Sequence, residues 1–363
     1  GPLDDLDISR YVPDGEVYEW VRNKHVVTHL LNTRGRRREE DYFAPQVFRA
    51  ASEWLHEAAS NRPFFLWVDS FMPHELWDPP ANYADRYFPN DGTLKDLIYP
   101  GVISRIQDPS EALIRRTMAL YAGCCTLVDT WIGHFLETLD KLRLWDDTLV
   151  IFVTDHGTEL MDHGEFTKWG AWEGKLHPYN TKLEWFIRHP GGMRGAHVDG
   201  LVQSHDLTPT VLDILGLPGC ELWDGRSAWP LVTGPAESIR ERIITGWGRW
   251  ASVRDCVWNC IIDPTKPDGT PRLFHVVRDP DENRDVARQY PEVVAEHRRY
   301  LEGLLGAPLP IRYKHQPDQG EYMTFASYLK RRGDAAGVLE HRASSQVAPP
   351  ADTDTLGLRS AAA

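Results

Sequence analysis

Apolar residues recur every three to four positions along several stretches of the chain, and this spacing predicts amphipathic helices. The predicted helices cover residues 39–60, 111–144, 211–215 and 290–305. The third is framed by residues that start and end helices, with Asp206 as the N-cap, Pro209 in the first turn and Gly216 as the C-cap.

Three short apolar runs lack this spacing and have the length of strands that are buried on both faces. They cover residues 64–68, 149–154 and 183–188. Because helical segments alternate with such runs along the chain, we predict an α/β fold with a largely parallel sheet.

The pattern changes at about residue 237, where short strand-like runs replace the long helices. These runs cover residues 242–246, 251–257, 259–263 and 273–277, before the helix at 290–305. We therefore predict an α/β core over residues 1–236 and a subdomain over 237–331, built as a small antiparallel sheet with one helix. Residues 332–363 are rich in Ala, Ser and Pro and predict a disordered tail.

Composition narrows the class of protein. The formal net charge of −13 argues against nucleic acid as a partner, because binding a phosphate backbone needs a basic face. No run approaches the about 18 apolar residues of a membrane-spanning helix, so no membrane partner is expected. The five cysteines are typical of reduced thiols, and no signal-peptide pattern precedes the first helix, so we expect a cytoplasmic protein.

Polar residues with metal-binding chemistry follow the second apolar run. Asp155-His156-Gly157 comes where that strand ends, and ligands collect at the carboxyl ends of parallel strands. An Asp oxygen with a His nitrogen suits Ca²⁺ or Mn²⁺, although two ligands do not hold a metal alone. The alternative is a turn in which the Asp caps a helix.

Further candidate groups flank this strand end. The following loop is dense in anion-binding and proton-transferring side chains, namely Asp162, His163, Lys168, Lys175 and His177. Trp169 and Trp172 in this loop, and Trp223 further on, are candidates for the wall of a substrate pocket. A solvated surface loop would carry the same charges, and His74, after the first strand, would serve equally as a loop-capping residue.

Taken together and in order, segments between about residues 40 and 305 resemble the sulfatase family of the alkaline-phosphatase superfamily. The resembling segments are residues 63–68 with 71–80, 128–129, 144–157, 162–164, 187–191, 202–216, and 273–275 with 279–283. The resemblance implies an alkaline-phosphatase-like fold, in which a mostly parallel sheet is flanked by helices. Two departures are Met72, where the family usually has Asp, and Glu184-Trp185, where it usually has Val-Pro.

The resemblance also implies roles for individual residues. Asp155 and His156 match part of the divalent-metal site, with calcium expected and manganese as the alternative. Lys168 matches the lysine that binds the sulfate oxygens and steadies the leaving group, with Lys175 as the fallback. His74 matches the histidine that contacts the sulfate ester. The implied partner is a small sulfated or phosphorylated substrate, His177 is a candidate acid/base, and a homo-oligomer is left open.

One family feature is not found in this sequence. Sulfatases take their nucleophile from Cys or Ser in C/S-x-P-x-R, converted to formylglycine in the Cys and many Ser cases, and no Cys, Ser or Thr here is followed by x-Pro-x-Arg. The family's N-terminal Asp-bearing strand is not found either. The expectation is a sulfuric ester hydrolase whose formylglycine lies in a segment absent from this chain, which alone is catalytically incomplete.

Two alternatives stay open at this point. The first is a phosphonate monoester or phosphodiester hydrolase of the same superfamily, in which an Asp-His metal pair is equally suitable. The second is a non-catalytic pseudoenzyme or binding subunit that has lost the nucleophile. The matched set of Asp155, His156, Lys168 and His74 favours an enzyme, because a lost site has no reason to keep it.

Overall fold

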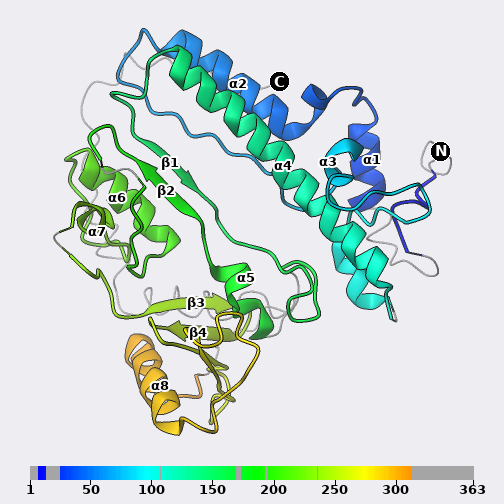
Figure 1. Cartoon of the computed structure of the whole chain (residues 1–363). Coiled ribbons are helices and arrows are strands. Elements are labelled where there is room, and N and C mark those ends of the chain that lie inside the picture. Colours follow the sequence, from blue (N-terminus) through cyan, green and yellow to red (C-terminus); the bar gives the residue numbers. More distant parts are fainter. Residues whose placement is uncertain are drawn as a thin grey trace. The chain divides into compact units, whose positions relative to one another are not determined.

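The computed structural model describes residues 7–13, 25–106, 108–168, 173–192, 195–234 and 236–311. These residues form two compact units, which are taken one at a time below (Figure 1). The first unit comprises the described residues up to 168, with 177–241 and 279–283, and the second comprises 173–176, 242–278 and 284–311. The predicted disordered tail at 332–363 lies outside the described residues.

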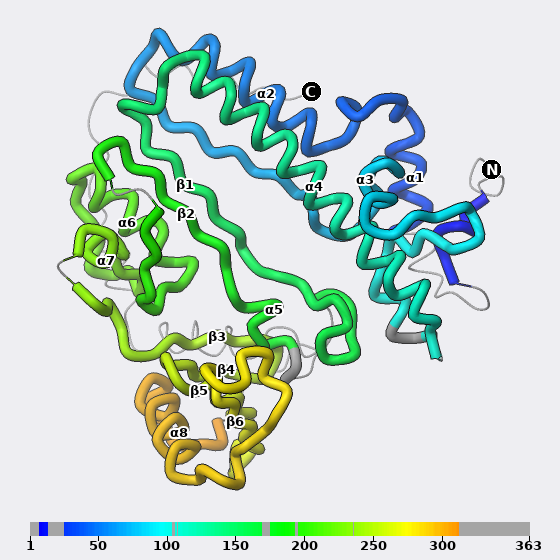
Figure 2. The backbone as a smooth tube through the Cα atoms, viewed as in Figure 1, coloured from blue at the N-terminus to red at the C-terminus, as the bar shows by residue number. Residues whose placement is uncertain are grey.

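Two long helices dominate the first unit and confirm the predicted ones. Helix α2 (Phe43–Ala58) packs along helix α4 (Glu111–Lys141), as the backbone trace in Figure 2 shows. The hydroxyl of Ser110 accepts the Leu113 N–H at 3.3 Å and so caps α4 at its N-terminus. The shorter helical elements before α4 are α1 (Val27–Thr33), η2 (Glu39–Asp41), α3 (Ala81–Ala84) and η3 (Pro100–Arg105).

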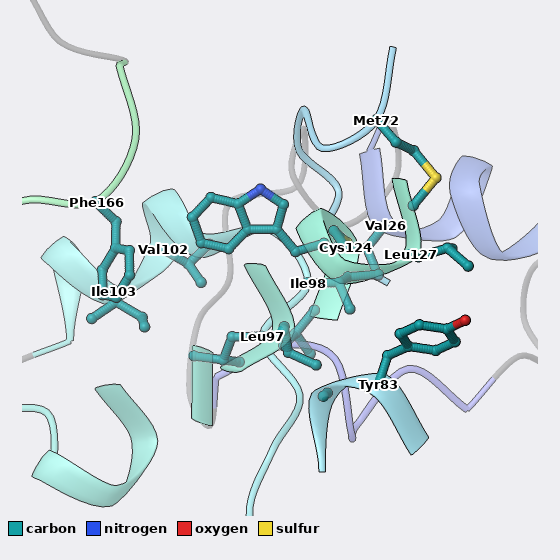
Figure 3. Packing of buried hydrophobic residues seen from close by; sticks show 14 of the residues in the cluster. Val26, Met72, Tyr83, Leu97, Ile98, Val102, Ile103, Cys124, Leu127 and Phe166 are labelled. Atoms are coloured by element: carbon teal, nitrogen blue, oxygen red, sulfur yellow. The ribbon is translucent and has the colours of Figure 1, made fainter. Parts of the chain in front are cut away.

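The main hydrophobic core lies where these helices meet the loop between α2 and α4. Its fully buried side chains include Val26, Trp77, Leu97, Ile98, Ile103, Cys124, Leu127 and Phe166 (Figure 3). Trp77 also donates its indole N–H to the Pro73 carbonyl at 3.1 Å. The core therefore anchors the loop that carries His74.

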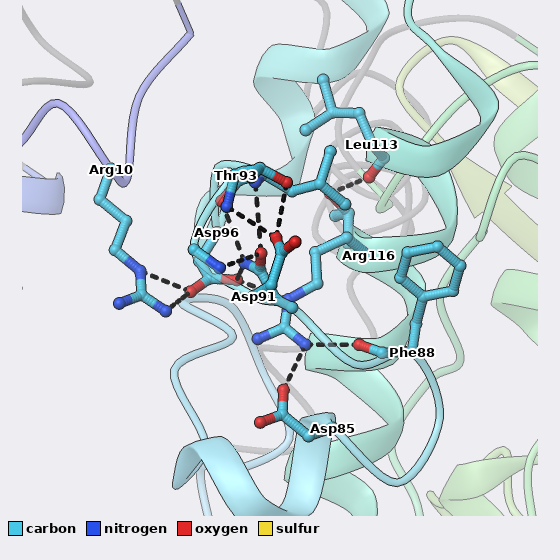
Figure 4. A network of polar contacts seen from close by, with 12 residues as sticks. Arg10, Asp85, Phe88, Asp91, Thr93, Asp96, Leu113 and Arg116 are labelled. Atoms are coloured by element: carbon cyan, nitrogen blue, oxygen red, sulfur yellow. Dashed lines mark hydrogen bonds and ion pairs between the residues drawn. The ribbon is translucent and has the colours of Figure 1, made fainter.

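A buried ion network holds the rest of this loop on α4. The Arg116 guanidinium donates to Asp96 at 2.6 Å, to Asp85 at 2.7 Å and to the Phe88 carbonyl at 2.6 Å (Figure 4). Arg10 donates to the second oxygen of Asp96 at 2.7 Å. Since both Asp96 oxygens accept from a guanidinium, the charge on this buried carboxylate is compensated.

The predicted parallel sheet is not present among the described residues. Strands β1 (Val150–Val153) and β2 (Trp185–Arg188) form where expected, but they pair with each other in antiparallel orientation. The predicted strand at residues 64–68 is extended but belongs to no ladder, and no backbone hydrogen bond joins residues 64–70 to another described residue. A strand-forming sequence makes a ladder only beside a neighbour that offers backbone partners.

The burial of this extended segment also differs from the prediction, because no strand lies beside it among the described residues. Phe64 and Leu66 pack on a second core cluster with Leu55, Leu139 and Leu144. The alternate side chains Phe65 and Trp67 are 74% and 64% exposed. The segment is thus partly buried on one face and exposed on the other, and not buried on both.

Short helices complete the first unit. They are α5 (Pro178–Thr181), η5 (Ser204–Asp206), α6 (Leu207–Ile214) and α7 (Trp229–Thr233). Asp206 precedes α6 as predicted, but its carboxylate makes no capping bond to that helix and binds Arg240 and the N–H groups of Gln203 and Arg226 instead. Gly216 follows α6 with a φ of 66°, the left-handed conformation that favours glycine.

The second unit confirms the predicted small antiparallel sheet with a helix. Its elements are η4 (Glu173–Leu176), β3 (Ile243–Trp247), β4 (Trp250–Arg254), β5 (Trp258–Ile262), β6 (Arg272–His275) and α8 (Pro291–Leu305). The strands pair in the order β3-β4-β5-β6. Leu301 and Leu305 of α8 pack in one buried cluster with Val253, Cys260 and Leu273. None of the helices in the described part of the chain is both long and apolar enough to cross a bilayer.

Candidate active site

A tight turn after the extended segment places His74. The His74 N–H donates to the Phe71 carbonyl at 2.9 Å, and the Ser70 hydroxyl donates to the Met72 carbonyl at 3.0 Å. With Pro73 held by Trp77 on the other side, the backbone of the turn is fixed at three points. The His74 ring stacks on the Phe71 ring, with 4.3 Å between their centroids.

Glu75 orients the imidazole of His74. The Nδ1 atom of His74 lies 2.7 Å from the carbonyl oxygen and 3.0 Å from the carboxylate of Glu75. Because a carbonyl only accepts, Nδ1 is the protonated nitrogen. The bond to the Glu75 carboxylate raises the pKa of His74 above its usual value, although burial of the ring lowers it. Burial alone would raise the pKa of Glu75, but the bond from His74 leaves it below its usual value.

Asp155 and His156 follow β1 at a tightly packed turn. The Thr154 N–H donates to the Glu184 carbonyl at 3.0 Å, and the Gly157 N–H donates to the Asn180 carbonyl at 3.0 Å. A Cβ at residue 157 would lie 2.0 Å from the carbonyl oxygen of Tyr179, so only glycine fits there.

The same turn fixes the tautomer of His156. Its Nδ1 lies 2.7 Å from the Gly157 carbonyl and must donate, which leaves the lone pair of the neutral ring on Nε2. That Nε2 atom is 3.5 Å from the carboxylate of Asp155 and 2.8 Å from Nζ of Lys168. The Asp155 side chain is 88% exposed, and one of its carboxylate oxygens accepts the His156 N–H at 2.9 Å.

Lys168 completes the group from the loop that follows. Its neighbour Phe166 is buried in the core, and the Thr167 N–H donates to the Glu159 carbonyl at 2.9 Å. Burial lowers the pKa of Lys168, and the charges of Glu75 and Asp155 only partly oppose this. The His74 and His156 rings meet edge to face, with 6.4 Å between centroids. The structure thus brings His74, Asp155, His156 and Lys168 together.

The other predicted residues have different surroundings. His177 is buried, with its Nδ1 2.8 Å from the Glu282 carboxylate and its ring stacked on His163 at 4.2 Å. Lys175 is buried and belongs to the second unit. Trp169 and Trp172 lie outside the described residues, and Trp223 is exposed.

Asp155 and His156 have the donor chemistry of one side of a divalent-metal site. A histidine that donates Nδ1–H to a carbonyl and keeps its lone pair on Nε2 has the tautomer typical of a metal ligand, and the nearby carboxylate adds an oxygen donor. The described residues contain no group of three or more His, Cys, Asp or Glu side chains that could hold a metal ion. The two residues therefore fit a partial ligand set.

Glu75 and Phe71 were not predicted from the sequence. Glu75 follows a candidate histidine, but adjacent side chains in an extended segment point to opposite faces, so the sequence gives no reason to pair them. The turn at residues 71–74 reverses that expectation. In the sequence, nothing distinguishes Phe71 from the other apolar residues near the end of the predicted strand. Its ring contact with His74 depends on the same turn.

A sequence profile of the sulfatase family, described as Sulfatase, matches residues 9–217, which is more than half of the chain. The chain therefore belongs to the sulfatase family of the alkaline-phosphatase superfamily. Arylsulfatase K of Xenopus laevis is 26% identical over 298 residues, covering 71% of this chain and 55% of the relative. Arylsulfatase K of Gallus gallus is 29% identical over 311 residues, covering 72% and 56%. The chain thus spans little more than half of these relatives.

Solved structures show the same fold. The phosphonate monoester hydrolase of Agrobacterium radiobacter superimposes with a TM-score of 0.60 at 23% identity, covering 74% of this chain and 61% of that one. A protein solved in complex with its substrate D-glucosamine-2-N,6-O-disulfate gives a TM-score of 0.59 at 18% identity, covering 73% and 69%. This chain is therefore similar to these proteins in its backbone fold as well as to its relatives in sequence.

Proposed function

We propose that the protein carrying this chain hydrolyses sulfate esters at the site formed by His74, Asp155, His156 and Lys168. The observation that carries the proposal is the convergence of a lysine, two histidines and a carboxylate from two loops in a chain of the sulfatase family. A transferring sulfuryl group spreads negative charge over its oxygens. Fixed positive groups stabilise that charge without rearranging during the reaction.

Each residue has a part in this proposal. Lys168 binds a sulfate oxygen through its ammonium group, beside His156. His74 keeps Nδ1–H on Glu75 and presents Nε2 to the ester oxygen that leaves with the alcohol. Asp155 and His156 hold a divalent cation, with calcium expected and manganese the alternative. When bound, the cation polarises a sulfate oxygen and adds positive charge to the site.

We also propose that the formylglycine nucleophile comes from a polypeptide segment outside these residues. The support is the open face of the first unit: Phe65 and Trp67 are exposed on a segment with no described backbone partner, and Phe186 of β2 is 61% exposed beside Phe152 of β1. An added strand would cover these side chains and satisfy the backbone. If it ran parallel to β1, its carboxyl end would lie near Asp155.

Hydrolysis of phosphonate monoesters is the second candidate, and its support is the likeness to the Agrobacterium radiobacter enzyme at a TM-score of 0.60. The same lysine, histidine and cation would serve a phosphonyl group. The two candidates differ in the charge of the group transferred. Rates with a sulfate monoester and a phosphonate monoester of the same alcohol separate them.

The test uses the protein purified from its natural source, so that any segment beyond these residues is present. Its mass spectrum is searched for formylglycine, and hydrolysis of an aryl sulfate is compared between the wild type and Lys168→Ala and His74→Ala variants. Both variants should lose activity, whereas Lys182→Ala, which removes an exposed lysine of the same unit, should keep it. A wild-type protein that hydrolyses neither ester, and carries no formylglycine, would identify a non-catalytic family member.

A further inference from the structure

Phe71 is an exposed aromatic ring in direct contact with the candidate site. Its side chain is 68% exposed, and its ring lies nearly parallel to that of His74, with 4.3 Å between centroids and 25° between planes. Phe65 and Trp67, the other exposed aromatic residues of the same segment, have no ring contact with a site residue in the described part of the chain. Of these three aromatic residues, Phe71 is therefore the one whose ring packs against a residue of the candidate site.

The ring is also held in position. The bond from the His74 N–H to the Phe71 carbonyl closes the turn at 2.9 Å, and the bond from Ser70 to the Met72 carbonyl braces it at 3.0 Å. The His74 ring against which Phe71 stacks is itself fixed by Glu75. An apolar surface that is ordered before binding loses little entropy when a ligand covers it.

We propose that Phe71 is a specificity-determining residue that stacks on the organic part of the substrate and selects esters whose leaving group is an aromatic ring. This inference rests on the proposed function, in which His74 faces the ester oxygen. The group attached to that oxygen then passes beside the His74 ring and meets the exposed ring of Phe71. Offset stacking of two aromatic rings adds attraction beyond simple burial, which an acyclic chain does not provide.

The experiment compares two substrates on the protein purified in full. Phenyl sulfate supplies the ring, and an acyclic alkyl sulfate with a leaving group of similar acidity does not. In the Phe71→Leu variant, KM for phenyl sulfate should rise by about 2- to 13-fold, the size of one aromatic pair contact, while the constants for the alkyl sulfate stay unchanged. Phe43→Leu, the same change at an exposed position on α2, should alter neither substrate.

Two results would overturn the inference. Equal losses with both substrates would mean that Phe71 only holds His74 in place, and unchanged constants with both would mean that the ring is covered by polypeptide or unused. If the wild type hydrolyses no ester, the proposed function is wrong, but the role of Phe71 can still be tested by measuring ligand binding. Phenyl sulfate should bind more tightly than methyl sulfate, and Phe71→Leu should abolish the difference; equal binding in the wild type overturns the inference.

Discussion

The Nζ atom of Lys168 lies 2.8 Å from Nε2 of His156, and this contact joins the proposed anion-binding group to the proposed metal-binding group. Since Nδ1 of His156 donates to Gly157, the ammonium group can donate to the lone pair on Nε2. A cation bound at Nε2 would replace this hydrogen bond and repel the ammonium group. Lys168 would then turn toward an anionic substrate, so cation and substrate should bind cooperatively.

Replacement of Lys168 by Met should lower kcat by about 10²- to 10³-fold, because the site loses one preorganised donor to the charge that develops on the sulfate oxygens. The measurement is steady-state hydrolysis of an aryl sulfate by the purified protein. Circular dichroism of the variant checks that the fold is kept. A loss of less than threefold would show that Lys168 does not bind the reacting group.

Removal of divalent cations by a chelator should abolish activity, and calcium or manganese should restore it. Asp155→Asn and His156→Gln should weaken the cation affinity, since each substitution alters one donor at the end of β1. Calorimetric titration of each cation into the chelated protein measures this affinity. Asp162→Asn, a change of the same kind further along the loop, is the control and should leave the affinity unchanged. Equal cation affinities in all variants would show that the cation does not bind at Asp155 and His156.

The charge of His74 should respond to Glu75. Since the bond to the Glu75 carboxylate raises the pKa of His74, the imidazolium persists to a higher pH than in an ordinary histidine and is lost as the pH rises through that raised value. In Glu75→Gln the loss should move to lower pH, and the falling limb of the activity profile should move with it. NMR titration of the His74 ring measures the shift directly, with Glu282→Gln, at the buried His177–Glu282 pair, as control.

Asp206 should be important for stability. Burial opposes its charge, but the bonds from Arg240 and from the N–H groups of Arg226 and Gln203 leave the pKa of Asp206 below its usual value. Asp206→Asn, which leaves Arg240 buried and unpaired, should cost about 3–5 kcal/mol of the free energy of unfolding. Chemical denaturation measures this cost, and exposed Asp224 gives the matched control Asp224→Asn.

The same group predicts a pH dependence of stability. A carboxylate whose pKa is lower in the folded chain than in the unfolded chain stabilises the fold above its unfolded pKa. This contribution is lost as the pH falls through the folded pKa. The wild type should therefore lose more stability on acidification than Asp206→Asn, and parallel acid losses in the two proteins would contradict the role of Asp206.

Local patterns predicted the elements of this chain better than their pairing. The periodicity that indicated α2 and α4, and the short runs that indicated β3 to β6, depend on residues close in sequence. The pairing of residues 64–68 depends on what lies beside them, which periodicity does not report. Likewise, His74, Asp155, His156 and Lys168 were candidates from the sequence, but Glu75 became visible only through the turn that begins at Phe71.

The open aromatic face has a consequence for the folding of the polypeptide. Phe65, Trp67 and Phe186 present large apolar surfaces, and the backbone beside the first two has unpaired hydrogen-bonding groups among the described residues. Such an edge is a template for pairing with any extended chain. Polypeptides in which this face stays uncovered should therefore bind chaperones and tend to aggregate.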